Sequence, residues 1–356
     1  MLAVLILAAA LWGLGRLLGV DRGRRGIVVG ALFLAVLLLQ LVLPGGHPLR
    51  QATGGSAAPW LLLAGAAALV LAYRAVLLRL KARATAREAP PPPAGQSGPF
   101  TDTELERYAR HIVLRELGGP GQKRLKDAKV LVIGAGGLGA PALQYLGAAG
   151  VGTIGIVDDD IVENANLQRQ VIHRDADIGM PKVFSAERAI LAQNPHVTVR
   201  PYHRRLTEDV AAELLSDYDL VLDGTDNFDT RYLVNRVAVA QGKPLVSGAL
   251  SQWEGQLSVF DPARGAPCYR CIFPEAPAPG LAPSCAEAGV LGPLPGVVGA
   301  MMAVEAVKLI AGTGAPLRGE MLIYDALWSE TRKIGLKRRP DCPECGTGAG
   351  VEVATA

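Results

Sequence analysis

Apolar residues are distributed in two different ways along this chain of 356 residues. The first 80 residues hold three long apolar stretches, at 1–20, 27–43 and 57–78, which are broken only by Arg16 and Arg74. A helix needs about 20 such residues to cross a bilayer, so we expect a membrane anchor of about three transmembrane helices in residues 1–80. The first stretch could instead be a signal peptide, but it lacks a basic start and leads into further apolar segments.

Beyond residue 100 the apolar runs are shorter and alternate with mixed segments, which is typical of an α/β domain. Strands are expected at 129–133, 153–157, 219–222, 244–247, 256–260 and 321–324, and helices at 138–149, 232–240 and 295–311. The expected fold is a Rossmann-like, doubly wound, mostly parallel sheet within residues 101–346. Four consecutive prolines cannot continue a helix, so residues 81–100 are expected to form a Pro-rich linker. Residues 347–356 are expected to be a flexible tail.

Charge predicts the orientation of the anchor in the membrane. Basic clusters lie between the first two apolar stretches, at 22–25, and after the third, at 74–87, whereas the loop 44–56 carries only Arg50. The positive-inside rule places both clusters on the cytoplasmic side, so the N-terminus starts outside and the α/β domain lies in the cytoplasm. The expected location is therefore the inner (cell) membrane, with several spans and a cytoplasmic catalytic domain.

The charge balance differs between the two parts of the chain. Residues 1–100 contain 10 Lys and Arg against 2 Asp and Glu, and the remainder contains 26 against 31. Basic patches with interleaved aromatic residues are absent from the acidic part, so nucleic-acid binding is not expected.

A glycine-rich turn follows the first expected strand of the domain. Gly134, Gly136 and Gly139 lie between that strand and a helix, where a backbone without Cβ atoms can approach a phosphate. The next strand ends in Asp158, in the place where a carboxylate can accept the ribose hydroxyls. A dinucleotide-dependent dehydrogenase would share these features.

Two cations beyond the second strand favour a nucleoside triphosphate over a nicotinamide dinucleotide. Arg169 and Lys182 could neutralise phosphate charge, and Asn166 and Gln168 offer neutral hydrogen-bonding groups beside them. Solvated surface residues are the alternative for both cations, and their position after a glycine turn and an acidic strand end argues against it.

The strand expected at 219–222 is followed by Asp-Gly-Thr-Asp-Asn, at an edge of the sheet where ligands collect. Asp226 could hold a magnesium ion that bridges the phosphates. The alternative is that Asp226 or Asn227 caps the following helix, and Asp223 could be a turn residue.

All five cysteines lie after residue 260. Two Cys-x-x-Cys pairs, Cys268 with Cys271 and Cys342 with Cys345, have the spacing of knuckles that hold a tetrahedral structural zinc. Two disulfides are the alternative, which a cytoplasmic location disfavours.

Residues 103–346 resemble the MoeB/ThiF/HesA adenylyltransferases, which are relatives of the ubiquitin-activating enzymes. The resemblance rests on the motifs RYARHIVL, GAGGLG, NLQRQ, GMPK, DGTDN, CYRC, CAEAGV and CPEC, which occur in the family's order. It implies that ATP activates the C-terminal glycine of a ubiquitin-like sulfur carrier, MoaD-like or ThiS-like, as an acyl adenylate, with release of pyrophosphate.

The resemblance also implies roles for particular residues. Nucleotide roles fall to Gly137, Asp158, Arg169, Lys182 and Asp226, and Arg110 matches an arginine that family dimers lend to the neighbouring subunit. A homodimer is therefore expected. The carboxylate of the carrier is itself the nucleophile, so no histidine is given a catalytic role. Cys285 matches a cysteine that some members use covalently, and a buried apolar role is the alternative.

The motifs describe carrier activation rather than the pathway it serves. Molybdopterin synthesis is the first choice and thiamine synthesis the next, and a separate protein is expected to donate the sulfur. A tRNA-modifying dehydratase is a less favoured relative because both Cys-x-x-Cys pairs are complete. An NAD-dependent oxidoreductase and a non-catalytic membrane scaffold are the alternatives from other functional classes.

Overall fold

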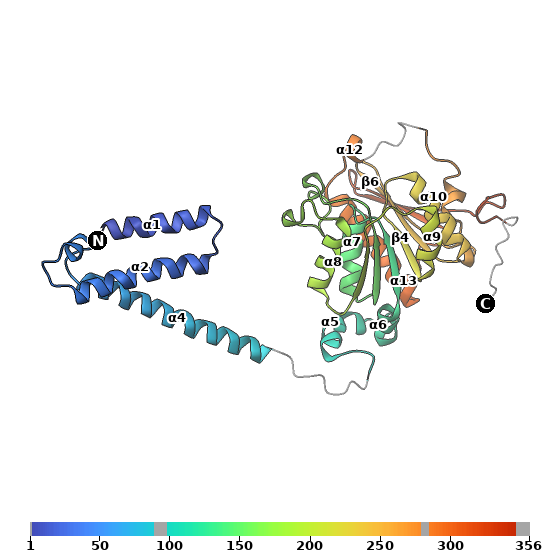
Figure 1. Ribbon diagram of the computed structural model, residues 1–356. Helices are drawn as coiled ribbons and strands as arrows, with labels where there is room; N and C mark the ends of the chain where they lie inside the picture. Colours follow the sequence, from blue (N-terminus) through green and yellow to red (C-terminus); the bar gives the residue numbers. More distant parts are fainter. Residues whose placement is uncertain (1, 89–97, 279–284, 347–356) are drawn as a thin grey trace. The chain divides into compact units, whose positions relative to one another are not determined.

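The computed structural model describes residues 2–88, 98–278 and 285–346. The chain divides into two compact units, Met1–Gly95 and Gln96–Ala356. Figure 1 labels their elements in chain order.

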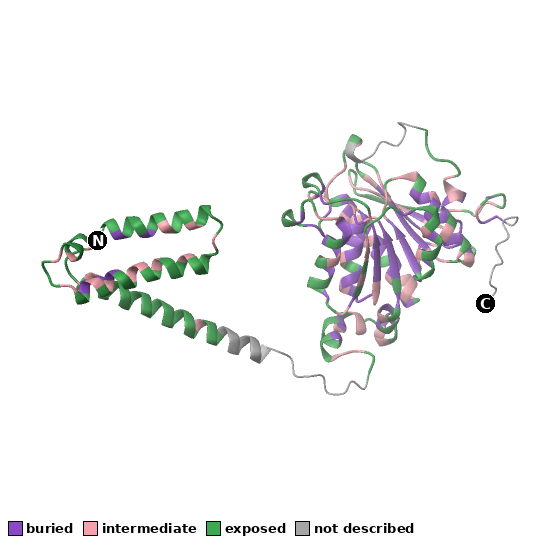
Figure 2. Cartoon of the chain, in the orientation of Figure 1, coloured by how far each residue is buried: buried purple, intermediate pink, exposed green. Residues whose placement is uncertain are grey.

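The first unit is a helical bundle. Its helices are α1 (Leu2–Leu17), α2 (Arg22–Val42), the short α3 (Pro48–Ala52) and α4 (Ala58–Glu88). Trp60 of α4 packs with Val4 of α1 and Val36 of α2 in the small core that joins these three helices. Most other residues in the range 2–80 are exposed (Figure 2).

Two helices of this unit are long and apolar enough, by length and composition, to cross a membrane. They are α2 and the segment Ala58–Leu80 of α4, of which 11% and 0% is buried within the protein. Helix α1 is shorter, with 16 residues. Helix α4 extends to Glu88, so residues 81–88 of the expected linker are helical. The four consecutive prolines of the expected linker, like the expected tail at 347–356, lie outside the described residues.

The second unit is built on one eight-stranded sheet with the order β3-β2-β1-β4-β5-β6-β7-β8. The strands are β1 (Lys129–Ile133), β2 (Thr153–Val157), β3 (Thr198–Tyr202), β4 (Leu220–Asp223), β5 (Leu245–Leu250), β6 (Glu254–Phe260), β7 (Glu320–Asp325) and β8 (Glu330–Gly335). Strands β1 to β5 pair in parallel, and β6, β7 and β8 extend the sheet through antiparallel pairs.

Helices cover both faces of this sheet (Figure 1). One apolar core includes residues of α6 (Gly118–Asp127), α7 (Gly139–Ala149), α8 (Lys182–Gln193) and α13 (Pro293–Ala311). The other includes α9 (Glu208–Ser216) and α10 (Phe228–Ala240). The remaining helices are α5 (Asp102–Ile112), α11 (Tyr269–Ile272) and α12 (Cys285–Ala288), with 3-10 turns η1 (Asn164–Asn166), η2 (Asp175–Asp177) and η3 (Pro262–Arg264).

Strand β1 shows why these short apolar runs form central strands. Val130 and Val132 enter the core under α7 and α13, and Leu131 and Ile133 enter the core under α9 and α10. Successive side chains of a strand point to opposite faces, so a strand buried on both sides must be apolar throughout.

The expected α/β fold with a mostly parallel sheet is confirmed, and each expected strand is present within three residues of its predicted ends. The sequence prediction missed both edge strands, β3 and β8. All six residues of β8 are exposed, so it lacks the apolar run that marked the central strands. Helices α5, α6, α8 and α9 were not predicted either. Helix α13 is as apolar as a membrane span, yet half of it is buried against the sheet.

The chain order places a switch point between β1 and β4, because β2 and β3 lie on one side of β1 and β4 and β5 on the other. Open α/β sheets bind ligands at such a point, beyond the carboxyl ends of the strands. Gly134 has a φ of 90° there, and a Cβ at Gly139 would lie 1.8 Å from the Gly134 carbonyl oxygen. Only glycine at 139 permits this close packing of helix α7 under the turn.

Replacing Gly139 with alanine is expected to destabilise the domain by roughly 1–3 kcal/mol or more, because the new methyl group overlaps backbone that cannot move freely. Gly136→Ala is the control, since a Cβ at Gly136 would meet nothing closer than 3.7 Å. Thermal unfolding should show a clearly lower Tm for Gly139→Ala only. Equal Tm values for the two variants would contradict this account of the turn.

Candidate active site

A cavity of about 700 Å³ lies beyond the carboxyl ends of the central strands. Its walls come from the glycine turn after β1, the end of β2, the segment around η1, the loop after β4, and strands β5 and β6. Among the predicted site residues, those that line it are Gly134, Gly136, Gly137, Asp158, Asn166, Arg169, Lys182, Asp226 and Asn227.

Asp158 holds the glycine turn in place from the end of β2. Its Oδ2 accepts a hydrogen bond from the N–H of Ala135 at 2.7 Å, and its Oδ1 accepts one from the N–H of Asp160 at 2.8 Å. Burial raises the pKa of the Asp158 carboxyl group, and the positive charge of Lys182 opposes that shift. A carboxylate has about four acceptor positions, so Asp158 can still accept a ribose hydroxyl.

His173 supports the same turn from below. Its Nε2 lies 3.0 Å from the carbonyl oxygen of Ala135, and its Nδ1 lies 2.9 Å from the hydroxyl oxygen of Ser185. Burial lowers the pKa of His173, which favours the neutral ring. These contacts give His173 a structural role beneath the site.

The two predicted cations line the cavity in different environments. Lys182, at the start of α8, is buried, and its Nζ lies 2.7 Å from Oδ2 of Asp160. Arg169 is half-buried and donates to the carbonyl oxygen of Ala165 at 3.0 Å. Its Cδ is 3.9 Å from the place that a Cβ of Gly137 would take. The cavity therefore presents positive charge directly beside the glycine turn.

Helix capping and metal binding were the two roles predicted for the polar residues of the loop after β4. Asn227 caps α10, since its Oδ1 accepts the N–H of Thr230 at 2.8 Å. Asp223 is a buried turn residue whose Oδ1 accepts from the backbone N–H and hydroxyl of Thr225. Asp226 is exposed at the cavity. Because Asn227 supplies the cap, the Asp226 carboxylate is available to a cation.

A second acidic group also lines the cavity. One carboxylate oxygen from each of Asp158, Asp159 and Asp160 lies within 4.8 Å of the other two. Asp160 pairs with Lys182 and Asp158 accepts two backbone N–H groups, so two of the three carboxylates are already engaged.

Four predicted residues do not line the cavity as the structure describes it. Gly139 lies under the turn, where it permits close packing. Gln168 is exposed and packs on Gly292, because a Cβ there would lie 2.7 Å from its Oε1. Arg110 is exposed on α5. Cys285 begins α12, and its side chain lies outside the described residues.

The sequence prediction also missed residues of the cavity wall. Gln170 is buried and lines the cavity where Gln168 was expected. Arg231 of α10 is buried and binds the carbonyl oxygen of Gly248 at 2.7 Å, with Asp223 Oδ2 3.5 Å away. Arg204 and Arg205, beyond β3, add positive charge to the wall. Arg231 lies one residue before the helix expected at 232–240 and was given no role, and β3 was not recognised.

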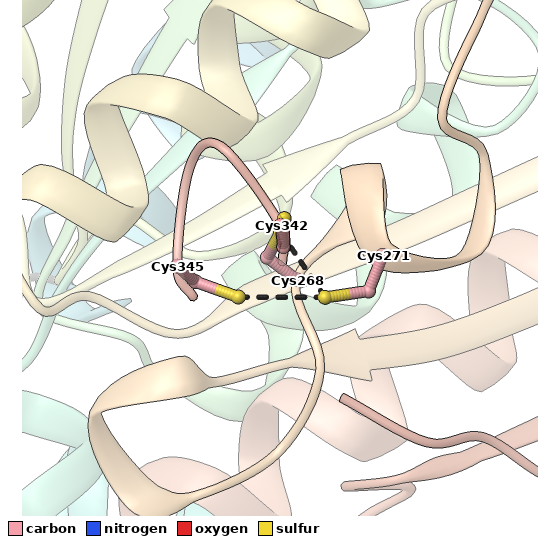
Figure 3. A group of neighbouring side chains, drawn as sticks. All are labelled: Cys268, Cys271, Cys342 and Cys345. Atoms are coloured by element: carbon pink, nitrogen blue, oxygen red, sulfur yellow. Dashed lines mark hydrogen bonds between the residues drawn. The ribbon is translucent and has the colours of Figure 1, made fainter. Parts of the chain in front are cut away.

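The four cysteines of the two Cys-x-x-Cys pairs form a buried group (Figure 3). Sulfur separations are 3.9 Å for Cys268 to Cys271, 3.6 Å for Cys268 to Cys342 and 3.4 Å for Cys271 to Cys345. A disulfide requires about 2.05 Å, so the arrangement is that of free thiols around a shared centre.

Contacts between the two knuckles hold this arrangement. The Arg270 guanidinium, between the first two cysteines, lies 2.9 Å from the Glu344 carboxylate, between the second two. Burial raises the pKa of the Cys345 thiol to about 11 and raises that of Cys268 as well. Hydrogen bonds from the backbone lower the pKa of Cys342 against the effect of burial, and a bound cation would stabilise all four groups as thiolates.

Residues 108–344 match the sequence model of the ThiF family. The chain is 53% identical over 251 residues to a sulfur carrier protein adenylyltransferase of Thermus thermophilus, covering 69% of this chain and 93% of that protein. It is 50% identical to the SAMP-activating enzyme E1 of Haloferax volcanii, covering 69% and 90%. It is 52% identical to the probable adenylyltransferase/sulfurtransferase MoeZ of Mycobacterium tuberculosis, covering 71% and 66%.

Solved structures share the fold. Escherichia coli MccB, crystallised with ATP, superimposes with a TM-score of 0.59 at 23% identity, covering 67% of this chain and 74% of that one. PaaA superimposes with a TM-score of 0.60 at 23% identity, covering 74% and 83%. The family match spans more than half of the chain, and the curated relatives are similar over most of the second unit. The chain therefore belongs to the ThiF family and is an adenylyltransferase.

Proposed function

We propose that this adenylyltransferase transfers AMP from ATP to the C-terminal glycine carboxylate of a ubiquitin-like sulfur carrier protein, with release of pyrophosphate. The observation that carries the proposal is the 53% identity to a sulfur carrier protein adenylyltransferase over 93% of its length. The walls of the cavity support it, because a glycine turn, a ribose acceptor and several cations surround one space of about 700 Å³.

The proposed reaction needs no protein nucleophile. The carrier carboxylate attacks the α-phosphorus, and the bond from that phosphorus to the bridging oxygen of the pyrophosphate group breaks. The protein has to align the reactants and stabilise the added negative charge. The glycine turn would receive the phosphates, Asp158 would accept ribose hydroxyls, and Arg169 and Lys182 would neutralise the phosphate oxygens.

Asp226 is the proposed magnesium ligand. Its carboxylate is exposed at the cavity and is free of the helix cap that Asn227 provides. Magnesium prefers oxygen ligands and is commonly held by one or two carboxylates together with phosphate oxygens. When bound, the ion would supply Lewis-acid stabilisation of the triphosphate.

The cysteine group is the proposed structural zinc site. Zinc bound tetrahedrally at about 2.3 Å from each sulfur would place the sulfurs about 3.8 Å apart. The separations given above for three of the sulfur pairs, from 3.4 to 3.9 Å, fit that geometry. Four thiolates leave no open coordination position, so the metal would hold the two knuckles together without reacting.

The carrier and pathway are open to two assignments. Molybdopterin synthesis with a MoaD-like carrier is the first, and thiamine synthesis with a ThiS-like carrier is the alternative. Relatives include MoeZ and the mouse adenylyltransferase and sulfurtransferase MOCS3, of whose length this chain covers 66% and 56%. A separate protein is the proposed sulfur donor.

The proposed assembly is a homodimer anchored in the inner membrane. Arg110 is exposed on α5 and does not line the cavity, so it would act in the site of the partner subunit. Helix α2 and part of α4 have the length and composition of membrane spans, and the basic residues beside them favour a cytoplasmic catalytic domain.

Asp226→Asn is expected to lower carrier-dependent pyrophosphate exchange on the order of 100-fold, because it removes the charge that holds the metal. Asp229→Asn is the control, since Asp229 is also exposed and lies three residues further on, in the first turn of α10, but does not line the cavity. Arg169→Ala should lose most activity as well. Full exchange by Asp226→Asn would refute the assigned role.

A mixture of Arg110→Ala and Asp226→Asn proteins extends this test to the dimer. If sites are shared, each mixed dimer contains one site with both intact residues, so partial activity should return after subunit exchange. No recovery in proven mixed dimers would refute the shared site and leave the role of Asp226 standing.

The purified protein is expected to contain one zinc per chain, measured by elemental analysis. Cys345→Ser should lose the metal and lower the Tm, because the second knuckle is then released. Cys285→Ser should retain the metal, since Cys268, Cys271, Cys342 and Cys345 by themselves supply four thiolates. A metal-free protein with two disulfides would contradict the proposed site.

A reporter fused after Ala356 is expected to behave as cytoplasmic. The same reporter inserted in the loop 44–56 should lie on the opposite side of the membrane, because this loop carries only Arg50. A C-terminal reporter that is active only outside the cytoplasm would overturn both the topology and the access to ATP.

A further inference from the structure

A chain of three polar contacts lies beneath the glycine turn. His173 is 5% exposed, and its Nε2 lies 3.0 Å from the carbonyl oxygen of Ala135. Its Nδ1 lies 2.9 Å from the hydroxyl oxygen of Ser185. That hydroxyl oxygen lies 2.6 Å from Oδ2 of Asp177, which is buried. The chain therefore runs from the turn, through the imidazole ring and the hydroxyl group, to a carboxylate.

These contacts need more hydrogen atoms than a neutral ring provides. The Ala135 carbonyl oxygen can only accept a hydrogen bond, and so can the carboxylate of Asp177, which forms an ion pair with Arg188. The Ser185 hydroxyl supplies one hydrogen atom, and a neutral imidazole ring supplies one. Two hydrogen atoms thus serve three contacts, so one contact stays unmatched whichever way the hydroxyl turns.

The missing hydrogen atom belongs on Nδ1 of His173. Because the Ala135 carbonyl oxygen cannot donate, the neutral ring carries its hydrogen on Nε2 to keep that contact. A second proton on Nδ1 would be donated to Ser185, and the hydroxyl hydrogen could then go to Asp177. The doubly protonated ring therefore satisfies all three contacts, and satisfied buried polar groups are the more stable arrangement.

Two effects oppose this second proton in the free protein. Burial lowers the pKa of His173, and the positive charge of Lys182 lowers it further, although the hydrogen bond to Ala135 raises it. Lys182 lines the cavity, whereas His173 does not line it as the structure describes it. A negatively charged ligand in the cavity would therefore offset the charge of Lys182 and raise the pKa of His173 from the other side of the turn.

The remaining charged groups around the ring do not remove this effect. The Asp177 carboxylate favours a positive ring, and its ion pair with Arg188 offsets part of that attraction. Asp158, at the end of β2, binds the N–H of Ala135 on the other side of the turn. Residues 134–144, which form the turn and the start of α7, contain no ionisable side chain.

We propose that His173 is a positioning residue that takes up a proton on Nδ1 when the triphosphate of the nucleotide binds. The proton comes from the solvent, and the new N–H is the only covalent bond formed. The ring then donates from both nitrogens and ties Ala135 of the turn, through Ser185, to the carboxylate of Asp177. This inference rests on the proposed use of ATP, and His173 acts through the turn rather than on the nucleotide.

Calorimetric titration of the full-length protein with magnesium-ATP tests the proposal. Titrations at about pH 7 in two buffers of different ionisation enthalpy count the protons taken up on binding. The unmodified protein should take up roughly half a proton more than His173→Gln, because the carboxamide cannot be protonated. Protons bound by the nucleotide itself are common to both titrations. His196→Gln is the matched control, since His196 lies before β3, at the end of the sheet away from the cavity.

The affinity for ATP should depend on pH in the same sense. If binding raises the pKa of His173, the added affinity is present below the pKa of the free protein and is lost as the pH rises through the pKa of the complex. Between about pH 6 and 8, the Kd of the unmodified protein should rise about threefold more per pH unit than the Kd of His173→Gln.

A purely structural role for His173 predicts a lower Tm for His173→Gln with an unchanged proton count, and that result would overturn the proposal. Ser185→Ala keeps the ring but removes the acceptor for the Nδ1 proton, so its proton uptake should also fall. This variant decides the question if His173→Gln does not fold, and uptake equal to that of the unmodified protein would overturn the proposal. If the unmodified protein does not bind ATP, the proposed function fails; if it binds ATP with the same proton count as the folded variants, only the role of His173 fails.

Discussion

The close packing of the glycine turn against its surroundings is the constraint on which the rest of the site depends. Gly134 lies against the backbone of Gly224 after β4, where a Cβ would approach its carbonyl oxygen to 3.3 Å, and helix α7 passes directly beneath at Gly139. Asp158 binds the N–H of Ala135 and His173 contacts its carbonyl oxygen. The turn is thereby held from both adjacent strands and from below, with its open side toward the cavity.

The cysteine group is connected to the same cavity. Tyr269 follows Cys268, lines the cavity, and donates its backbone N–H to Oδ1 of Asn235 on α10 at 2.8 Å. Asn227, beside Asp226, is the N-cap of helix α10. The knuckles, this helix and the exposed carboxylate thus form one packed unit, so a metal that fastens the knuckles would also steady one wall of the site.

Short apolar runs, together with the glycines and charged residues that follow them, made much of this structure predictable from sequence. The central strands are buried on both faces, and the glycines and Asp158 stand at strand ends, with Asp226 in the loop after β4 and Lys182 at the start of α8, where the fold brings them to one cavity. Edge strands β3 and β8 carry mixed residues and gave no such signal. Gln168 and Gln170 cannot be told apart by motif, because only the fold decides that one packs on Gly292 and the other is buried in the cavity wall.

The central claim is that this chain forms an acyl adenylate on a carrier protein, and mass spectrometry of the carrier tests it most directly. The full-length protein would be incubated with magnesium-ATP and with a MoaD-like or a ThiS-like carrier in turn. The mass of the C-terminal peptide of each carrier would then be measured. The account predicts the added mass of AMP on the terminal glycine of one carrier, with ATP but not with NAD. No adenylate on any carrier, from a folded protein that binds ATP, would contradict it.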